Sequence, residues 1–127
     1  MDQRVQWLQH KKKNILQVDL RGAEREQFLQ ATEDFSRLLQ ETKDGSALVL
    51  LIVADLDFDP EALLKAKRAM LAAQPKLKRS ALVGVDGVFK VFMDGFYSLL
   101  HFLGSDVPED RGKHFKGIEE AKDWLAR

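Results

Sequence analysis

ALVLLIVA, residues 47–54, is a run of eight consecutive apolar residues that is rich in branched side chains. An unbroken apolar run of this length predicts a central β-strand that is covered on both faces, as strands of parallel sheets are. We therefore expect this strand to form the middle of the hydrophobic core.

Strands and helices are predicted to alternate on both sides of this run. Apolar and polar residues alternate over 5–9 and 16–20, around the polar residues 11–14, which predicts an antiparallel hairpin. Apolar residues recur at helical spacing over 24–43. Beyond the central strand we expect a helix over 59–74, a strand over 81–85, a helix over 88–103, a short edge strand at 114–116 and a last helix near 118–125.

This alternation predicts an α/β fold built as a right-handed βα superhelix. Its parts are a mostly parallel sheet of four to five strands, an N-terminal antiparallel hairpin at the sheet edge and four helices. The chain has 127 residues, of which 45% are hydrophobic and 31% are charged. That length and balance suit one compact domain, which we expect to span residues 1–127.

Composition argues against several classes of protein. Twenty basic and twenty acidic residues give a formal net charge of zero, so no overall field attracts nucleic acid. The chain has no cysteine, which excludes disulfides and thiol chemistry. No apolar stretch reaches the roughly 20 residues of a membrane span, and the first residues lack the apolar run of a signal peptide. We expect a cytoplasmic protein without a transmembrane segment.

Residues 88–103, VFKVFMDGFYSLLHFL, predict an unusually apolar helix. Its polar residues cover only about 80° of the circumference, so most of the helix needs a cover. That cover is the chain's own sheet, a second subunit or an apolar ligand. The candidate apolar contact or ligand surface consists of Phe89, Phe92, Phe96, Tyr97 and Phe102.

We predict no catalytic residues, no cofactor site and no metal site. Asp94, Ser98 and His101 have the residue types of a hydrolytic triad, but about 10 Å of helix rise separates the aspartate from the histidine. Residues 84–87, GVDG, lack the spacing of a phosphate-binding loop and are interpreted as a turn. The three histidines have no metal-ligand spacing to one another or to a carboxylate.

Four segments resemble the STAS-like, SpoIIAA-like family, whose founding relatives are anti-sigma factor antagonists and the STAS domains of sulfate transporters. They are ILQVDLRG, LVLLIVAD, KLKRSALVGVDGVFKVF and HFKGIEEAKDWL, and the resemblance runs from about Ile15 to Leu125. It implies the same βα superhelix and a small stand-alone branch of the family. The fold of this branch is also likened to the CRAL-TRIO lipid-binding domain.

The resemblance also implies a regulatory site, and the sequence departs from it there. Anti-sigma factor antagonists are switched by phosphorylation of a serine or threonine at the start of the helix after the central strand. Here residues 54–60 read ADLDFDP, and neither residue type occurs between Ser46 and Ser80. The candidate partner loop is Asp55, Asp57, Phe58 and Asp59. The alternative is that Asp59 caps a helix and the other aspartates solvate a loop.

Charge is also uneven around this loop. Six basic residues and no acidic one lie between Ala62 and Val85: Lys65, Lys67, Arg68, Lys76, Lys78 and Arg79. They either solvate an outer face or bind an anionic partner or lipid headgroup. A third alternative is that they pair with the acidic residues Asp55, Asp57, Asp59 and Glu61 of a second copy in a self-complementary dimer.

Two functions remain compatible with the sequence. The first is a non-enzymatic regulatory or protein-interaction domain of STAS-like type, which acts as a homodimer or by docking a protein partner. The second is a binder or carrier of a small apolar ligand or lipid, with the aromatic residues of 88–103 forming the pocket wall.

Overall fold

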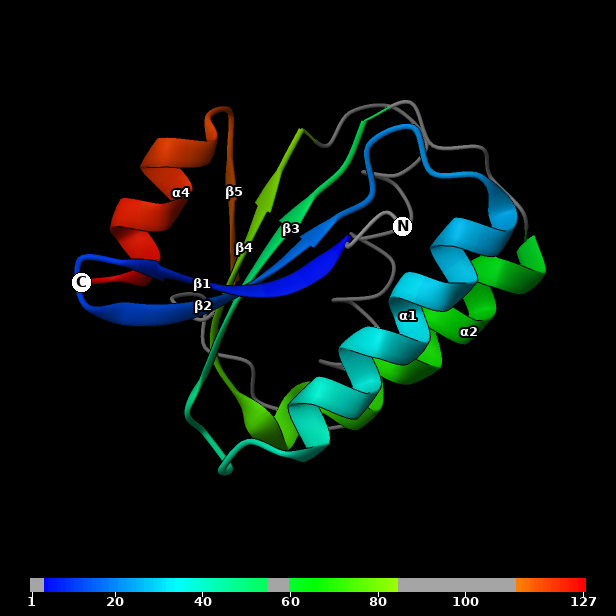
Figure 1. The fold of residues 1–127 in the computed structure, drawn as a ribbon, viewed down its shortest axis with the longest axis horizontal. Helices are drawn as coiled ribbons and strands as arrows, with labels where there is room; N and C mark the ends of the chain where they lie inside the picture. The colour runs from blue at the N-terminus through cyan, green and yellow to red at the C-terminus, as the bar shows by residue number, and fades with distance from the viewer. Residues whose placement is uncertain (1–3, 55–59, 85–111) are drawn as a thin grey trace.

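The computed structural model describes residues 4–54, 60–84 and 112–127. In these residues a five-stranded sheet lies between helices on its two faces (Figure 1). No helix in the described ranges is long and apolar enough to cross a membrane. The elements in chain order are β1 (Val5–His10), β2 (Lys13–Asp19), α1 (Arg25–Gln40), β3 (Ala47–Ile52), α2 (Pro60–Ala73), the 3₁₀ helix η1 (Gln74–Lys76), β4 (Leu77–Val83), β5 (Gly112–Phe115) and α4 (Ile118–Leu125).

The strand order in the sheet is the same as the strand order in the chain, β1-β2-β3-β4-β5. β1 pairs with β2 in antiparallel orientation, and the other pairs are parallel. The α/β class, the mostly parallel sheet and the hairpin at its edge are therefore confirmed. Three α-helices lie in the described residues, whereas the helix expected over 88–103 falls outside them.

One face of the sheet packs against α1 and α2, which lie side by side in Figure 1. Both helices connect parallel strands that advance in the same direction across the sheet, so crossovers of one hand place them on the same face. The core on this face includes Leu16 and Val49 from the sheet, and Phe28 and Leu39 from α1.

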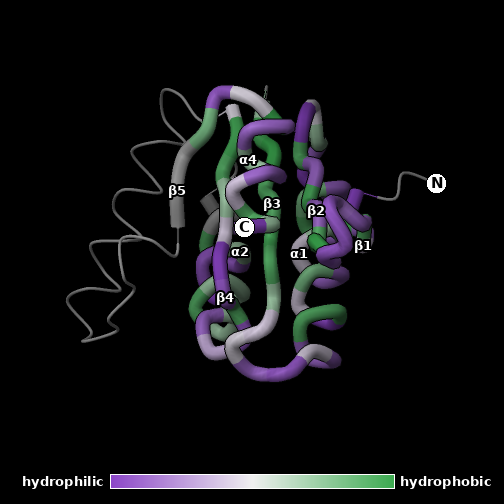
Figure 2. The backbone as a smooth tube through the Cα atoms, turned by 90° about the vertical axis from the view of Figure 1, so that its left-hand side faces the viewer, coloured by the Kyte–Doolittle hydropathy of each residue, from purple (hydrophilic) through white to green (hydrophobic). Residues whose placement is uncertain are grey.

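The opposite face packs against α4, where Trp124 and Leu125 cover Leu50 and Ile15. Side chains alternate between the two faces along β3, because successive residues of a strand point in opposite directions. Val49 accordingly belongs to the α1 and α2 side, and Leu50 to the α4 side. The central strand is thus buried on both faces, as its apolar run predicts, and Figure 2 shows the hydrophobic residues concentrated along it.

The β1–β2 hairpin turns through a two-residue loop, Lys11–Lys12, within the predicted polar segment 11–14, and Lys13 and Asn14 already belong to β2. Both lysines have positive φ, 50° and 67°. Loops of this kind usually contain Asn and Gly, because positive φ is unfavourable for residues with longer side chains. The turn lies against α4: Asp123 Oδ1 is 2.7 Å from His10 Nε2 and 3.1 Å from Lys11 Nζ.

β4 begins at Leu77, four residues before the predicted start at Ala81, and ends at Val83, not Val85. The expected boundaries leave its basic residues outside the strand, but Arg79 has partners inside the fold. Its Nη1 donates to the Trp124 carbonyl oxygen at 3.0 Å, and its guanidinium carbon lies 5.4 Å from the centre of the Trp124 ring. A charged residue can therefore belong to this strand because its guanidinium has a hydrogen-bond acceptor and an aromatic ring beside it.

β4 is followed by Gly84, which has a φ of 84°. A Cβ at this position would lie 2.2 Å from the carbonyl oxygen of Val53. The amide of Val53 in turn donates to the carbonyl oxygen of Val83 at 2.9 Å. Glycine therefore permits both the backbone turn and the close approach of the two chain segments at the end of the parallel strands.

Candidate partner-binding surface

The candidate partner loop, Asp55, Asp57, Phe58 and Asp59, lies outside the described residues, as do all five aromatic residues of the candidate apolar surface. Their roles therefore stay predictions. The residues that flank the loop are described. Ala54 follows β3, and its carbonyl oxygen accepts a hydrogen bond from the amide of Gly22 at 2.9 Å. On the other side of the loop, Pro60 begins α2.

The helix that follows this loop presents one exposed side, which we call the α2 stripe: Glu61, Leu64, Lys65 and Arg68. Their spacing of three, four and seven residues places them on one side of an α-helix. The other side of α2 contributes Ala62 and Ala73 to the core against α1. Leu64 is 47% exposed, so an apolar side chain lies among three charged ones in solvent.

The first turn of α2 is linked to the start of α1. Nη2 of Arg25 lies 3.4 Å from Oε2 of Glu61. Both side chains are about half exposed or more, so the pair contributes little to stability, on the order of 0–1 kcal/mol.

A polar network joins β1, β2 and α1 at the end of the sheet where the parallel strands finish. Nη1 of Arg4 donates to the backbone oxygens of Asp19 and Arg21, at 3.2 and 2.9 Å, and its Nη2 donates to Gln27 Oε1 at 3.3 Å. Gln27 Oε1 also accepts the backbone amide of Glu24 at 2.9 Å, which completes a capping box for α1.

Asp19 and Arg21 form a two-point ion pair within this network. Nε and Nη2 of Arg21 donate to the two carboxylate oxygens of Asp19 at 2.9 and 2.7 Å. These hydrogen bonds lower the pKa of Asp19 below its ordinary value, and partial burial opposes them. The same pairing raises the pKa of Arg21. Because each charge already has a partner, we interpret the network as a brace for the loop between β2 and α1.

Ligand crevices in open α/β sheets form where the strand order reverses. The described sheet has no such reversal, because each strand is added beside the previous one. Within the described residues no cluster of three or more His, Cys, Asp or Glu side chains could hold a metal ion.

The six basic residues between positions 62 and 85 lie on both sides of the sheet. Lys65 and Arg68 are exposed on α2, whereas Arg79 points to α4 on the opposite face. Lys76 Nζ donates to the carbonyl oxygen of Thr42 at 2.9 Å and pairs with Asp44 Oδ1 at 3.0 Å. A single continuous basic patch is therefore not formed by these residues.

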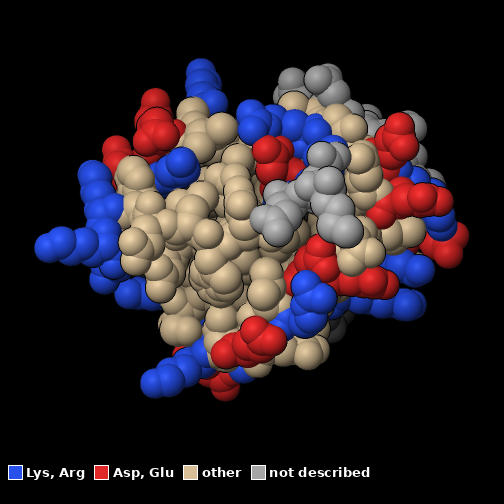
Figure 3. All heavy atoms as spheres, in the orientation of Figure 1, with Lys and Arg blue, Asp and Glu red and all other residues tan. Residues whose placement is uncertain are grey.

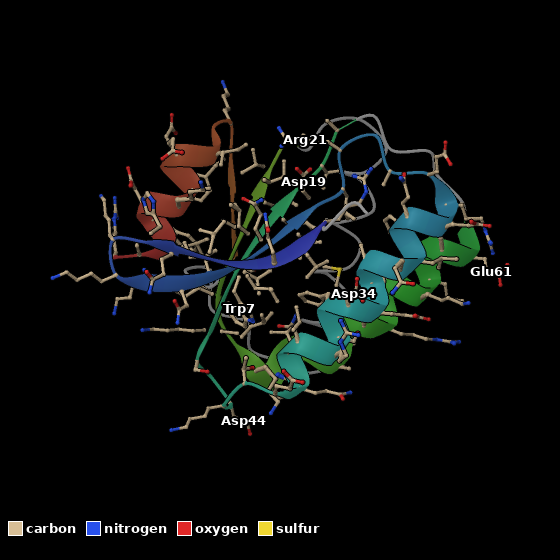
Figure 4. All side chains as sticks on the ribbon, in the orientation of Figure 1. Trp7, Asp19, Arg21, Asp34, Asp44 and Glu61 are labelled. Carbon is tan, nitrogen blue, oxygen red and sulfur yellow. The ribbon has the colours of Figure 1, made fainter. Side chains whose placement is uncertain are left out.

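Sequence reasoning did not predict the exposure of Trp7. Trp7 in β1 is 41% exposed, and together with Leu64 it makes up the exposed large hydrophobic side chains of the described residues. Figure 4 shows Trp7 beside the hairpin, far from the labelled Glu61 at the start of α2. The available signal is a tryptophan in a strand that the sequence places at the sheet edge.

A search of solved structures finds a STAS (anti-sigma-factor antagonist) domain protein from Planctomyces limnophilus. Its TM-score to this chain is 0.45 and its sequence identity is 16%, with 97% of this chain and 98% of that chain covered. It belongs to the family that the sequence resembles. The chain matches no family model and no curated protein sequence.

Proposed function

We propose that this chain is a non-enzymatic regulatory domain of STAS-like type that binds a protein partner through the α2 stripe and the adjoining loop 55–59. The observation that carries the proposal is the exposure of Leu64, 47%, at the centre of a charged helix side. Covering a leucine completely is worth about 1.5–3 kcal/mol relative to full exposure. A partner that covers Leu64 therefore gains on the order of 1 kcal/mol from this side chain.

The charges around Leu64 give the proposed surface its specificity. Glu61 lies in the first turn of α2, and Lys65 and Arg68 follow on the same side. A partner with an apolar centre and opposite charges in matching positions would fit this order, and charges at the rim of an interface mainly set orientation and association rate. Asp55, Asp57 and Asp59 would extend the acidic end of the surface.

The proposal includes no phosphorylation switch at the family's usual position, because no serine or threonine occurs between Ser46 and Ser80. At this place the resemblance implies a charge that phosphorylation adds, whereas this sequence has aspartates, which supply a fixed charge. We therefore expect partner binding that does not depend on a kinase. It also includes no reaction, because in the helix predicted over 88–103 the rise would separate Asp94 from His101, the aspartate and histidine of the triad-like set.

Site-specific photo-crosslinking tests this surface. A photo-reactive amino acid such as p-benzoylphenylalanine is placed at Leu64 or, as the matched control, at exposed Gln40 at the end of α1. In cells that produce the protein, we expect a defined crosslinked protein from position 64 and none from position 40. Arg68→Glu should abolish that crosslink while the circular dichroism spectrum stays unchanged. Equal crosslinking from both positions, or no effect of Arg68→Glu, contradicts the proposal.

The alternative function, binding of a small apolar ligand or lipid, depends on the aromatic residues of 88–103 and stays a prediction. Native mass spectrometry of gently purified protein tests it directly. A bound mass that is lost on denaturation supports a ligand, and an unliganded mass in every oligomeric state contradicts it.

Cytoplasmic localisation likewise stays a prediction, and fluorescence imaging of a tagged protein measures it.

A further inference from the structure

We propose that two copies of this chain join their sheets edge to edge through β1, in an antiparallel pair centred on Trp7. The inference rests on the backbone of the hairpin, the sequence of β1 and the charges at its two ends. It is independent of the α2 stripe.

The first step is the direction of the backbone groups of β1. In an antiparallel pair, residues alternate between those that bond to the neighbouring strand and those whose N–H and C=O groups point away from it. The two-residue loop makes His10 and Lys13 a hydrogen-bonded pair. At the other end, the amide of Asp19 donates to the Arg4 carbonyl oxygen at 2.8 Å, which fits the same alternation. The backbone groups of three β1 residues therefore point outward: Val5, Trp7 and Gln9.

The second step is the character of this edge. β1 is the first strand in the sheet order, and no strand of the described residues pairs with its outer side. Natural edge strands are usually protected by charged side chains, proline, a bulge or short length. Residues 5–9, VQWLQ, contain no charge and no proline, and pair with β2 without a register shift. β5 at the other end of the sheet order has only four residues. Figure 3 shows an uncharged area in the middle of the view, over the hairpin.

The third step is self-complementarity. In an antiparallel pair centred on Trp7, this residue lies opposite the partner's Trp7, and Val5 lies opposite the partner's Gln9. Each residue whose backbone groups point outward then lies opposite a residue of the same kind in the other copy. The two residues of each pair exchange two N–H···O bonds. The contact is isologous and closes as a two-fold dimer.

The side chain of Trp7 gains from the same arrangement. Trp7 pairs with Leu16 and so points to the α1 face of the sheet, beyond the part that α1 covers. Directly paired residues lie on one face, which brings the two indoles together. Cross-strand aromatic pairs contribute about 0.5–1 kcal/mol beyond the area that they bury.

Charge favours a second copy and the antiparallel direction. Lys11, Lys12 and Lys13 lie at the hairpin tip. A parallel arrangement would place the two tips together, and like charges would repel. In the antiparallel arrangement each tip passes the start of the other β1, where the Arg4–Gln27 hydrogen bond holds the first turn of α1. The start of α1 carries exposed Glu24 at its N-cap position and exposed Glu26 in its first turn, and Arg25 between them pairs with Glu61. The lysines of the tip are thus opposite in charge to Glu24 and Glu26.

Sedimentation equilibrium over a wide range of protein concentration tests the proposal. A six-residue edge is small beside a standard interface, so we expect a reversible dimer with a Kd of roughly micromolar order. Gln9→Pro removes an outward N–H but none of the bonds to β2, because Gln9 and Asn14 are not a hydrogen-bonded pair. It should raise the Kd at least about tenfold.

Two further variants separate edge pairing from other contacts. Trp7→Lys should also raise the Kd, whereas the matched control Leu64→Lys makes the same change at the other exposed hydrophobic residue and should leave the Kd unchanged. Trp7→Lys should leave the crosslink from position 64 intact, so the two proposals can fail separately. Unchanged circular dichroism spectra show that each variant is folded. A wild-type monomer at all concentrations overturns the proposal, as does a dimer that neither Gln9→Pro nor Trp7→Lys weakens.

The register can be measured because the chain has no cysteine. A spin label on Lys12→Cys reports only the distance between the two hairpin tips. In the proposed register the two labelled positions are ten residue steps apart along the direction of the strands, which corresponds to roughly 34 Å. Moving the centre by two residues changes this distance by roughly 14 Å. A distance near the first value supports the Trp7-centred pair, and a clearly different one overturns it.

Discussion

Replacing Gly84 by alanine should destabilise the fold far more than the same change at another glycine with positive φ. Two contributions add at this position. The first is the backbone conformation: a φ of 84° costs an alanine about 1–2 kcal/mol. The second is space, because the new Cβ would lie 2.2 Å from the Val53 carbonyl oxygen, where ordinary contacts begin near 3.4 Å.

The Val53 oxygen cannot move away cheaply. The amide of Val53 donates to Val83 at the end of the β3–β4 pairing, so a shift of about 1 Å weakens that bond and the packing beside it. Together we expect Gly84→Ala to lower the free energy of unfolding by about 3–5 kcal/mol. Gly22→Ala is the matched control, because Gly22 has a φ of 64° and nothing within 4 Å of its added Cβ. It should cost only about 1–2 kcal/mol.

Urea unfolding followed by circular dichroism measures both changes. With an m-value of about 2 kcal/mol/M, the difference between the two variants corresponds to a midpoint shift of about 1 M. If the two variants lose the same free energy within about 0.5 kcal/mol, the close approach of Gly84 to Val53 does not exclude a side chain, and the reasoning is refuted.

Three further changes address the hairpin, the polar network and the α4 contact. Lys12→Gly should raise the free energy of unfolding by about 1 kcal/mol, because glycine tolerates the positive φ; a lower melting temperature would contradict this. Asp19→Asn should cost about 1 kcal/mol at neutral pH, through the loss of its pairing with exposed Arg21. Because folding lowers the pKa of Asp19, this stabilisation is present above its ordinary value of 3.8 and disappears as the pH falls through the folded pKa, so the two proteins should converge in urea titrations at low pH. Arg79→Met should cost about 1–2 kcal/mol by removing the hydrogen bond and ring contact to Trp124, and a change within experimental error would show that these contacts are not stabilising.

The fold was largely predictable because its strongest signal is local in sequence. The run around Val49 and Leu50 predicts a strand buried on both faces, and the two residues do belong to opposite halves of the core. The alternation around Leu16 and Val18 predicts an antiparallel hairpin, which the pairing of β1 with β2 confirms. The helical spacing of residues 24–43 predicts α1, which ends at Gln40, since boundaries depend on capping contacts that periodicity does not encode.

What sequence reasoning missed depends on contacts between distant residues or on backbone geometry. Asp123 lies beside His10 across 113 positions, and no spacing rule predicts such a pair. Arg79 enters a strand because Trp124 offers it a carbonyl oxygen and a ring, which only the packed fold reveals. The turn at Lys11 lacks the Asn-Gly signal. Leu64 is exposed because α1 covers a different side of α2. The apolar pattern of the helix alone does not indicate which side will be covered.

The sequential order of the strands has a consequence for synthesis. Each of β2, β3 and β4 leaves the ribosome after the neighbour against which it pairs, so the sheet can grow in the order of translation with short loop closures. The face that α4 covers is different. Leu50 and Ile15 on this face lack their contacts with α4 until residues 118–125 have been made. Ribosome-bound chains that stop before residue 118 should therefore bind chaperones through this face, and longer chains should release them.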